Sequence, residues 1–370
     1  MGPEELKQAI YRCGKCKLCS IATYHPNENY LSICPSGEYY HYQAFYAPGR
    51  LEVLRGIMDG EIENSDGLLK VAYACTLCGA CYEKCRKISS IEQNHTEIFE
   101  EMRNLLVEKG CMTDAHCDIV EKVSKTGNAY GAPALQDYGH GKPEDTLYFI
   151  GCTSRNREPE IVDAMIAVLE ASGEKFHIFG DETCCGSVLF RTGQHEAAGI
   201  QVERNTRAIK ESGVKRIVFT CPGCLMTFRK NYPDLGVELL HSTEFITQCL
   251  NRLPLKKLDM NVTYHDPCHL GRHLGIYNEP REILNRITNM HEIKRKREQS
   301  WCCGSGGGVK SAFDDFALWS ARERISEAKE AARILTSACP FCKRNLVEAA
   351  DGSMEIYDVV ELVKLALEVR

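Results

Sequence analysis

Two pairs of adjacent cysteines are the residues of this sequence that most clearly suggest chemistry. One pair stands in "ETCCGS" and the other in "SWCCGS"; a single cysteine precedes each pair and a C-x2-C motif follows it. Five thiols exceed the four ligands of a zinc ion. Each set therefore predicts a larger metal centre, in which neighbouring thiolates bind different metal ions. The sets are Cys152, Cys184, Cys185, Cys221 and Cys224, and Cys268, Cys302, Cys303, Cys339 and Cys342.

The glycines after each pair, such as Gly186 and Gly304, would let backbone N–H groups approach an anionic centre. An alternative interpretation is that the adjacent cysteines are packing residues or a strained disulfide, with zinc bound by the C-x2-C motifs. Repetition of the whole five-cysteine set favours the larger centre.

The N-terminal cysteines show a different spacing, in which three thiols follow one another at intervals of three residues. "CGKCKLC" and "CTLCGAC" are both of this kind, and each works with one distant cysteine. Three closely spaced thiolates plus one from the other run is the bacterial ferredoxin pattern for [4Fe-4S] clusters. Zinc ribbons, the alternative, need only two C-x2-C pairs. We assign Cys13, Cys16, Cys19 and Cys85 to one cluster, and Cys34, Cys75, Cys78 and Cys81 to the second.

Composition limits the classes of protein that remain. The chain has 370 residues, a formal net charge of −6 and 21 cysteines. The negative charge argues against a nucleic-acid surface, the N-terminus is not typical of a signal peptide, and no apolar run approaches the ~18 residues of a membrane span. We expect a cytoplasmic protein, peripheral on the membrane only through a partner. Reduced thiols are the rule there, so the cysteines indicate metal binding.

The elements that must position these cysteines fall into three parts. The 40 residues between Cys34 and Cys75 have helical periodicity, so we expect residues 1–140 to form a helical domain with two [4Fe-4S] clusters. The Gly- and Pro-containing segment 126–145 is typical of a linker. Residues 145–255 and 259–370 are an internal duplication, with cysteines at offsets of 116 and 118 residues. Each copy alternates strands and helices, which predicts largely parallel sheets whose strand ends bring the cysteines together. The fold class is therefore a multidomain α+β protein.

The full cysteine pattern, with "YHDPCHLGR" at 264–272, resembles the CCG-domain iron-sulfur family, and the order of domains is similar to the catalytic subunit of membrane-associated heterodisulfide reductase of methanogenic archaea. The resemblance implies two related α/β domains that face each other, with a noncubane [4Fe-4S] cluster held by five cysteines in each. It also implies that the coenzyme M–coenzyme B disulfide is reduced to two thiols between them. All ten matching positions are cysteine here.

Such a reaction needs protons, and the second repeat has His265 and His269 beside Cys268 as candidate acid/base residues. Histidines at strand ends are also common as caps or packing residues. Candidate anion-binding residues are Arg155, Arg157, Arg191 and Arg272. We find neither a G-x-G-x-x-G nor a G-x4-GK[ST] motif. Without a nucleotide or flavin site, electrons must come from a partner protein such as a cytochrome b subunit, a flavoprotein or a ferredoxin, and we expect a hetero-oligomeric complex.

Two functions of different class follow. In the first, the chain is an iron-sulfur oxidoreductase that reduces a small-molecule disulfide at paired noncubane clusters, with electrons delivered through the two cubanes. In the second, it relays electrons between a flavoprotein dehydrogenase or electron-transfer flavoprotein and a quinone, cytochrome or ferredoxin pool. The complete cysteine sets favour the first. A structural role with zinc in place of clusters is a third interpretation.

Overall fold

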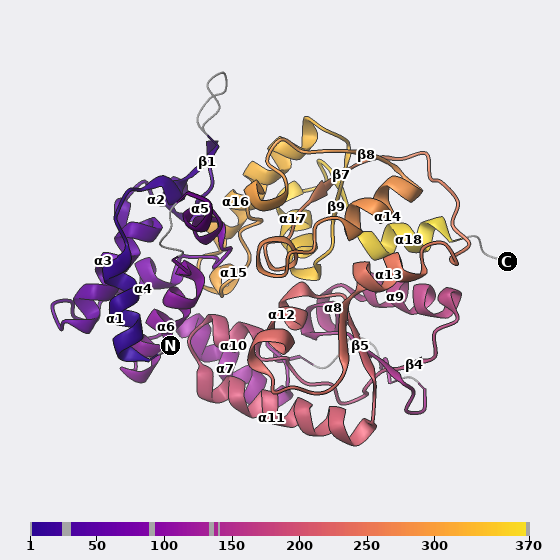
Figure 1. The fold of residues 1–370 in the computed structure, drawn as a ribbon, viewed down its shortest axis with the longest axis horizontal. Coiled ribbons are helices and arrows are strands. Elements are labelled where there is room, and N and C mark those ends of the chain that lie inside the picture. Colours follow the sequence, from indigo (N-terminus) through magenta and orange to yellow (C-terminus); the bar gives the residue numbers. More distant parts are fainter. Residues whose placement is uncertain (1, 24–30, 89–92, 133–136, 140, 368–370) are drawn as a thin grey trace.

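The N-terminal part of the chain is a group of helices at one end of the molecule, coloured indigo to purple in Figure 1. The computed structural model describes residues 2–23, 31–88, 93–132, 137–139 and 141–367. The helices pack on a small apolar core that includes Leu54, Phe99 and Met102. They are α1 (Pro3–Arg12), α2 (Pro35–Tyr40), α3 (Ala47–Met58), α4 (Asp66–Tyr73), α5 (Ala80–Ile88), α6 (His95–Glu108) and α7 (Asp114–Thr126), with a short antiparallel pair, β1 (Ile21–Thr23) and β2 (Leu31–Ser32).

The first repeat is a parallel sheet of four strands in the order β4-β3-β5-β6. The central strand β3 is fully buried, as expected for a parallel sheet with helices on its faces. Its strands are β3 (Thr146–Phe149), β4 (Phe176–His177), β5 (Arg216–Phe219) and β6 (Glu238–His241). Its helices are α8 (Cys152–Arg157), α9 (Pro159–Ser172), α10 (Ser187–Arg191), α11 (His195–Ser212), α12 (Pro222–Asn231) and α13 (Ser242–Cys249).

The second repeat has the same topology, β8-β7-β9-β10, again all parallel. Phe149 pairs with Phe219 in the first sheet, and His265 pairs with Ser337 in the second, so Phe149 and His265 occupy the same register position. The strands are β7 (Asn261–His265), β8 (Asn289–His291), β9 (Ile334–Ser337) and β10 (Glu355–Asp358). The helices are α14 (Glu279–Ile287), α15 (Val309–Ala312), α16 (Asp314–Lys329), α17 (Pro340–Ala350) and α18 (Val359–Ala366), with a π-helical turn at His269–His273.

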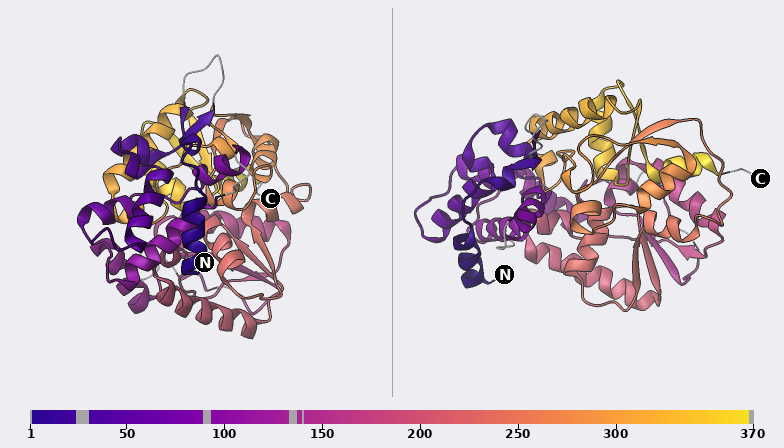
Figure 2. Two further views of the ribbon diagram at one scale, coloured as in Figure 1. Left: turned by 60° about the vertical axis from the view of Figure 1, so that its left-hand side comes forward. Right: turned by 45° about the horizontal axis from the view of Figure 1, so that its top comes forward.

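The two repeats share one apolar core, because α9 packs against α18 and α13 packs against α14. Both views of Figure 2 show the N-terminal helices beside the two repeats rather than at the end of an extended chain. The helical part contacts both: α6 packs on α10 of the first repeat, and α7 and α2 pack on α15 and α16 of the second. The predicted fold class is thus confirmed.

A glycine-rich loop joins the second repeat to the helical part. A Cβ atom at Gly307 would lie 2.6 Å from the carbonyl oxygen of Cys75, and one at Gly308 would lie 2.5 Å from Nε2 of His116. Both glycines have positive φ angles. The backbone of this loop therefore packs directly on the cysteine motif that precedes α5, which side chains at these positions would prevent.

The predicted domain boundaries remain predictions. Parts of the predicted linker, residues 133–136 and 140, lie outside the described residues, as do residues 1 and 368–370 at the ends of the first and last predicted domains. Within the described ranges, no helix has both the length and the apolar character required to cross a bilayer.

Candidate functional site

The eight N-terminal cysteines gather in two cavities of the helical part. One cavity is lined by Cys13, Cys16, Cys19 and Cys85, and the other by Cys34, Cys75, Cys78 and Cys81. Each cavity contains one of the two four-cysteine sets predicted from the sequence. Four sulfur donors around one cavity suit a [4Fe-4S] cubane.

The loops that carry these cysteines have left-handed backbone at positions without glycine. Lys15 and Lys17 lie between the first three cysteines with φ angles of 53° and 62°, and Leu77 lies between Cys75 and Cys78 with φ of 53°. Successive backbone amides in such turns form concavities that bind anions. This backbone suits the negative charge of an iron-sulfur cluster.

Arginine side chains lie beside the second cavity. Arg103 donates to the carbonyl oxygen of Cys75 at 2.7 Å, and Arg272 donates to that of Cys78 at 2.7 Å. Arg50 is also buried and lines the cavity. Burial raises the pKa of the Cys34 thiol to about 12, although the charge of Arg50 opposes this shift. Positive charges placed here would offset the cost of thiolates and of a buried anionic cluster.

The first five-cysteine set comes together at the carboxyl end of the first sheet. Cys152 begins α8 after β3, Cys221 caps α12, and Cys224 lies in its first turn. The thiol of Cys184 contacts that of Cys152, whereas the adjacent Cys185 contacts Cys224. The adjacent cysteines also contact each other, but beyond that contact they have different partners.

The second set repeats this arrangement. Cys302 contacts Cys268, while the sulfurs of Cys303 and Cys342 lie 3.3 Å apart. Backbone N–H groups approach the first sulfur of each pair: Gly186 donates to Cys184 and Gly304 to Cys302, each at 3.4 Å. Two sulfurs of one pair that point to different partners suit a centre with several metal ions better than a single zinc ion.

Two further contacts join the cysteine sets to one another. Cys221 of the first repeat contacts Cys339 of the second, and Cys302 contacts Cys78 of the helical part. Cys302 also lies 3.5 Å from the hydroxyl of Thr76. The second N-terminal set thus lies against the second repeat, which in turn lies against the first. Cysteine sulfurs therefore form a line from the second N-terminal set, through the second repeat, to the first repeat.

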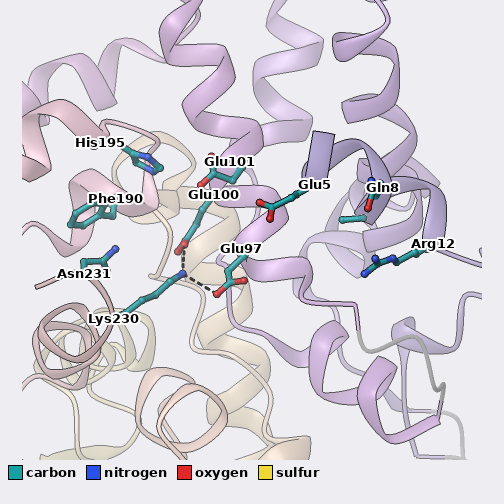
Figure 3. A pocket seen from close by; sticks show the side chains of 11 residues that line it. Glu5, Gln8, Arg12, Glu97, Glu100, Glu101, Phe190, His195, Lys230 and Asn231 are labelled. Atoms are coloured by element: carbon teal, nitrogen blue, oxygen red, sulfur yellow. Dashed lines mark hydrogen bonds and ion pairs between the residues drawn. The ribbon is translucent and has the colours of Figure 1, made fainter. Parts of the chain in front are cut away.

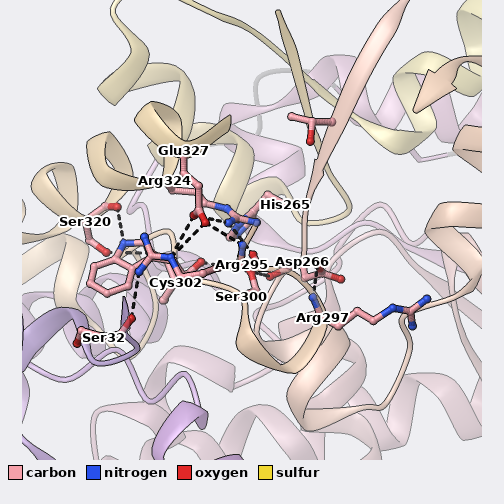
Figure 4. Close-up of polar contacts among 12 residues, drawn as sticks. Ser32, His265, Asp266, Arg295, Arg297, Ser300, Cys302, Ser320, Arg324 and Glu327 are labelled. Atoms are coloured by element: carbon pink, nitrogen blue, oxygen red, sulfur yellow. Dashed lines mark hydrogen bonds and ion pairs between the residues drawn. The ribbon is translucent and has the colours of Figure 1, made fainter. Parts of the chain in front are cut away.

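His265 ends β7 beside the second set. A ring nitrogen of His265 and the sulfurs of Cys303 and Cys342 all lie within 4.8 Å of one another. Nε of Arg324 donates to Nδ1 of His265 at 3.1 Å, and Arg324 also pairs with Glu327 (Figure 4). Burial lowers the pKa of His265 well below its ordinary value, and the charge of Arg324 lowers it further.

His269 follows Cys268 on the π-helical turn. Its Nδ1 lies 3.6 Å from the sulfur of Cys268, and Nε of Arg191 donates to its Nε2 at 3.4 Å. Burial lowers the pKa of His269, with a smaller contribution from the neighbouring His273. The structure places both histidines against cysteine sulfurs; the acid/base role predicted for them stays a prediction.

The candidate anion-binding arginines have structural partners. Arg155 donates to the carbonyl oxygens of Phe179 and Gly180, and Arg272 donates to those of Cys78, Glu298 and Ser300. Arg191 forms a buried ion pair with Glu100. Arg157 stacks over the ring of Tyr130. Arg157 also donates to the carbonyl oxygen of Asn156. All four are thus engaged within the chain; Arg155 and Arg191 are buried, and Arg157 and Arg272 are half-buried.

A groove of about 720 Å³ runs along the boundary between the helical part and the first repeat (Figure 3). Glu97 and Glu100 face Lys230 across it, with Lys230 Nζ 2.9 Å from Glu100 Oε2. At its inner side Glu100 contacts Arg191, which contacts His269. The groove therefore connects to the second cysteine set through charged side chains, although no cysteine is among its described lining residues.

Sequence reasoning missed several residues of this site. Arg324 and Arg103 lie in helices and are fully buried. Each of these arginines stands among the apolar positions of an amphipathic helix, and this pattern in the sequence could have indicated a buried arginine. Glu182, two residues before Cys184, accepts from the backbone N–H groups of Ile150 and Gly151; burial raises its pKa to about 7, although Arg155 lowers it.

Comparison with known proteins gives matches along most of the chain. A cysteine-rich domain model, CCG, matches residues 146–229 and 262–347, and a 4Fe-4S dicluster domain model matches residues 9–88. The chain is 36% identical to the D subunit of dihydromethanophenazine:CoB–CoM heterodisulfide reductase of Methanosarcina mazei, over 80% of this chain and 78% of that one. It is 33% identical to the protein of the same name in Methanosarcina barkeri, over 97% of this chain and 93% of that one.

More distant matches extend this comparison. The chain is 27% identical to the EtfAB:quinone oxidoreductase of Syntrophomonas wolfei, over 80% of this chain and 46% of that protein. A crystal structure of a hypothetical protein from Helicobacter pylori matches with a TM-score of 0.60 at 10% identity, over 87% of this chain and 68% of that one. The latter likeness concerns the fold alone.

Proposed function

The chain belongs to the family of heterodisulfide reductase D subunits, with a 4Fe-4S dicluster domain before two cysteine-rich CCG domains, and on this premise we propose that it reduces a disulfide to two thiols. Its relatives make it an iron-sulfur oxidoreductase. The proposed reaction is R–S–S–R′ + 2 e⁻ + 2 H⁺ → RSH + R′SH. The coenzyme M–coenzyme B disulfide is the substrate proposed.

The observation that carries this proposal is the complete pair of five-cysteine sets, joined where Cys221 meets Cys339. When bound, a noncubane cluster in each set would supply the electrons and an iron site for each sulfur of the substrate. The residues of this chain bring the two sets together at the carboxyl ends of two parallel sheets, where α/β proteins present their ligand sites. A disulfide could meet both sets at that junction.

Electrons would enter through the helical part. Cys16 is exposed, whereas the second N-terminal set is more buried and contacts the second repeat. Exposed Lys17 follows Cys16, and Lys84 lines the same cavity, whereas Lys15 before Cys16 pairs with Glu52. This positive surface favours a donor protein with an acidic docking face. Relatives named as subunits support a hetero-oligomeric complex.

A relay of electrons is the second candidate function. The likeness to an EtfAB:quinone oxidoreductase favours it, and the line of sulfurs would suit electron transfer equally well. In this case the partner would be an electron-transfer flavoprotein or a quinone pool, and no small-molecule disulfide would turn over.

Anaerobic turnover tests the choice between the two. Iron-loaded protein would receive electrons from reduced viologen, with the coenzyme M–coenzyme B disulfide as acceptor. We expect thiol formation that is lost in Cys303→Ser and kept in Cys117→Ser, which changes an exposed thiol outside every predicted set. If neither the parent nor Cys117→Ser forms thiols at full iron content, disulfide reduction is refuted and the electron-relay function is favoured.

A further inference from the structure

The two repeats differ at two residues beside their cysteines. His265 of the second repeat corresponds to Phe149 of the first by sheet register, and Phe149 packs against Phe219 and Phe228. At the offset of 116 residues that relates Cys268 to Cys152, His269 corresponds to Thr153. The second site therefore has two ring N–H groups where the first has a phenyl ring and a hydroxyl.

A buried arginine determines which nitrogen of His265 carries the proton. Arginine has only donors, so Nδ1 of His265 must accept from Nε of Arg324 and cannot itself be protonated. The hydrogen of the neutral ring is then on Nε2, which is buried and has no hydrogen-bond partner in the described part of the chain. A ring nitrogen of His265 lies within 4.8 Å of the sulfurs of Cys303 and Cys342, which makes these sulfurs the acceptors proposed for the Nε2 hydrogen.

The same argument applies to His269 with its nitrogens exchanged. Arg191 donates to Nε2, so the hydrogen is on Nδ1, which faces the sulfur of Cys268. Arg191 itself comes from the first repeat and is fixed by Glu100 of the helical part. Three parts of the chain thus cooperate to direct this N–H group.

Hydrogen bonds to cysteine sulfurs are one of the means by which proteins set the reduction potentials of iron-sulfur clusters. Each N–H donor stabilises the reduced, more negative cluster more than the oxidised one, because the electron density on sulfur rises on reduction. Two extra donors would raise the potential of the second site relative to the first.

We propose that His265 and His269 are hydrogen-bond donors of fixed tautomer to the cysteine sulfurs of the second repeat, and that they make its cluster the more easily reduced of the two. This inference rests on the clusters of the proposed function, not on its substrate. It differs from an acid/base role, since neither ring loses its proton. Because Cys302 contacts Cys78, the second repeat would also be the first to receive an electron from the helical part.

The test is a potentiometric titration of the iron-loaded full chain, followed by EPR spectroscopy. Cys185→Ser, which removes a predicted ligand of the first repeat, identifies the signal of the second. We expect His265→Phe and His269→Thr, which introduce the first repeat's own residues, to lower the potential of that signal alone. A tenfold change in the ratio of reduced to oxidised cluster corresponds to about 59 mV for one electron.

Conservative variants separate a donor role from packing. His265→Gln and His269→Asn keep an N–H group near the original position, and we expect them to retain most of the parent potential. His291→Phe changes an exposed histidine of β8 and serves as the control. If His265→Phe does not retain iron, His269→Thr and His269→Asn still decide the question.

A direct spectroscopic signature completes the experiment. Pulsed EPR of the reduced second site should show a weak ¹⁴N coupling that changes on ¹⁵N-histidine labelling and weakens in His265→Phe. Unchanged potentials in both loss variants at full iron content would overturn the inference, as would a shift only in the pH profile of turnover, which would indicate proton donors. Parent protein with iron for the cubanes alone would instead refute the noncubane sites of the proposed function.

Discussion

Replacement of Gly307 by alanine should separate the second repeat from the helical part. Gly307 has φ of 63°, and an added Cβ would lie 2.6 Å from the carbonyl oxygen of Cys75 and 2.9 Å from the carbonyl carbon of Thr76. Both atoms are backbone and cannot move aside as a flexible side chain could. Arg103 also donates to the carbonyl oxygen of Gly307 at 2.8 Å. The loop would have to withdraw from the motif that carries Cys75 and Cys78.

Two costs contribute to the effect. Left-handed backbone costs an alanine about 1–2 kcal/mol, and overpacking of a close contact costs about 1–3 kcal/mol. Gly352→Ala isolates the first cost, because Gly352 has φ of 75° and an added Cβ there would meet no described atom within 4 Å. We therefore expect Gly307→Ala to destabilise the chain by about 2–5 kcal/mol and Gly352→Ala by about 1–2 kcal/mol.

The assay has two readouts on iron-loaded protein. The first is the thermal midpoint, which should fall further for Gly307→Ala than for Gly352→Ala. The second is the rate at which the second-repeat cluster is reduced after a rapid electron supply to the cubanes; only Gly307→Ala should slow it. Equal midpoints and equal rates for the two variants would refute the idea that the glycine loop holds the two parts in contact.

Three further predictions concern other parts of the chain. Arg103→Met should destabilise the protein by about 2–6 kcal/mol, because it leaves two buried carbonyl groups, those of Cys75 and Gly307, without their donor. The thermal midpoint measures this, and an unchanged midpoint would contradict it. Burial lowers the pKa of His116 to about 4. Its neutral form therefore stabilises the fold above pH ~6.5, and this contribution is lost as the pH falls toward 4, by up to about 1.4 kcal/mol per pH unit. Thermal midpoints measured from pH ~7 to ~4 should fall less steeply in His116→Gln than in the parent, and parallel curves would count against this prediction. Lys17→Glu should slow reduction by an acidic donor protein at low salt but not at high salt; a rate equal to that of the parent at low salt would show that the donor docks elsewhere.

Much of the site could be predicted from the sequence because its signals are local. The interval of three residues between Cys75, Cys78 and Cys81 predicts the loop that lines one cavity, and the repeat of the cysteine pair predicts two equivalent sets. The alternation of strands and helices predicts parallel sheets with cysteines at strand ends. The same reasoning named Arg191 and Arg272 as candidate anion-binding residues, but both are engaged inside the chain. No local pattern indicates which charged side chains find a partner on folding.

The sequence by itself determined the class of chemistry, because the five thiols of each repeat and the two N-terminal sets of four cysteines indicate iron-sulfur centres without reference to the fold. It also determined the duplication and hence the two matching sheets. Only the tertiary structure decided that Cys78 contacts Cys302, that Arg324 directs His265, and that the glycine loop packs on Cys75. These contacts join residues far apart along the chain. Their partners are chosen by the packing of whole domains, which no spacing within one segment encodes.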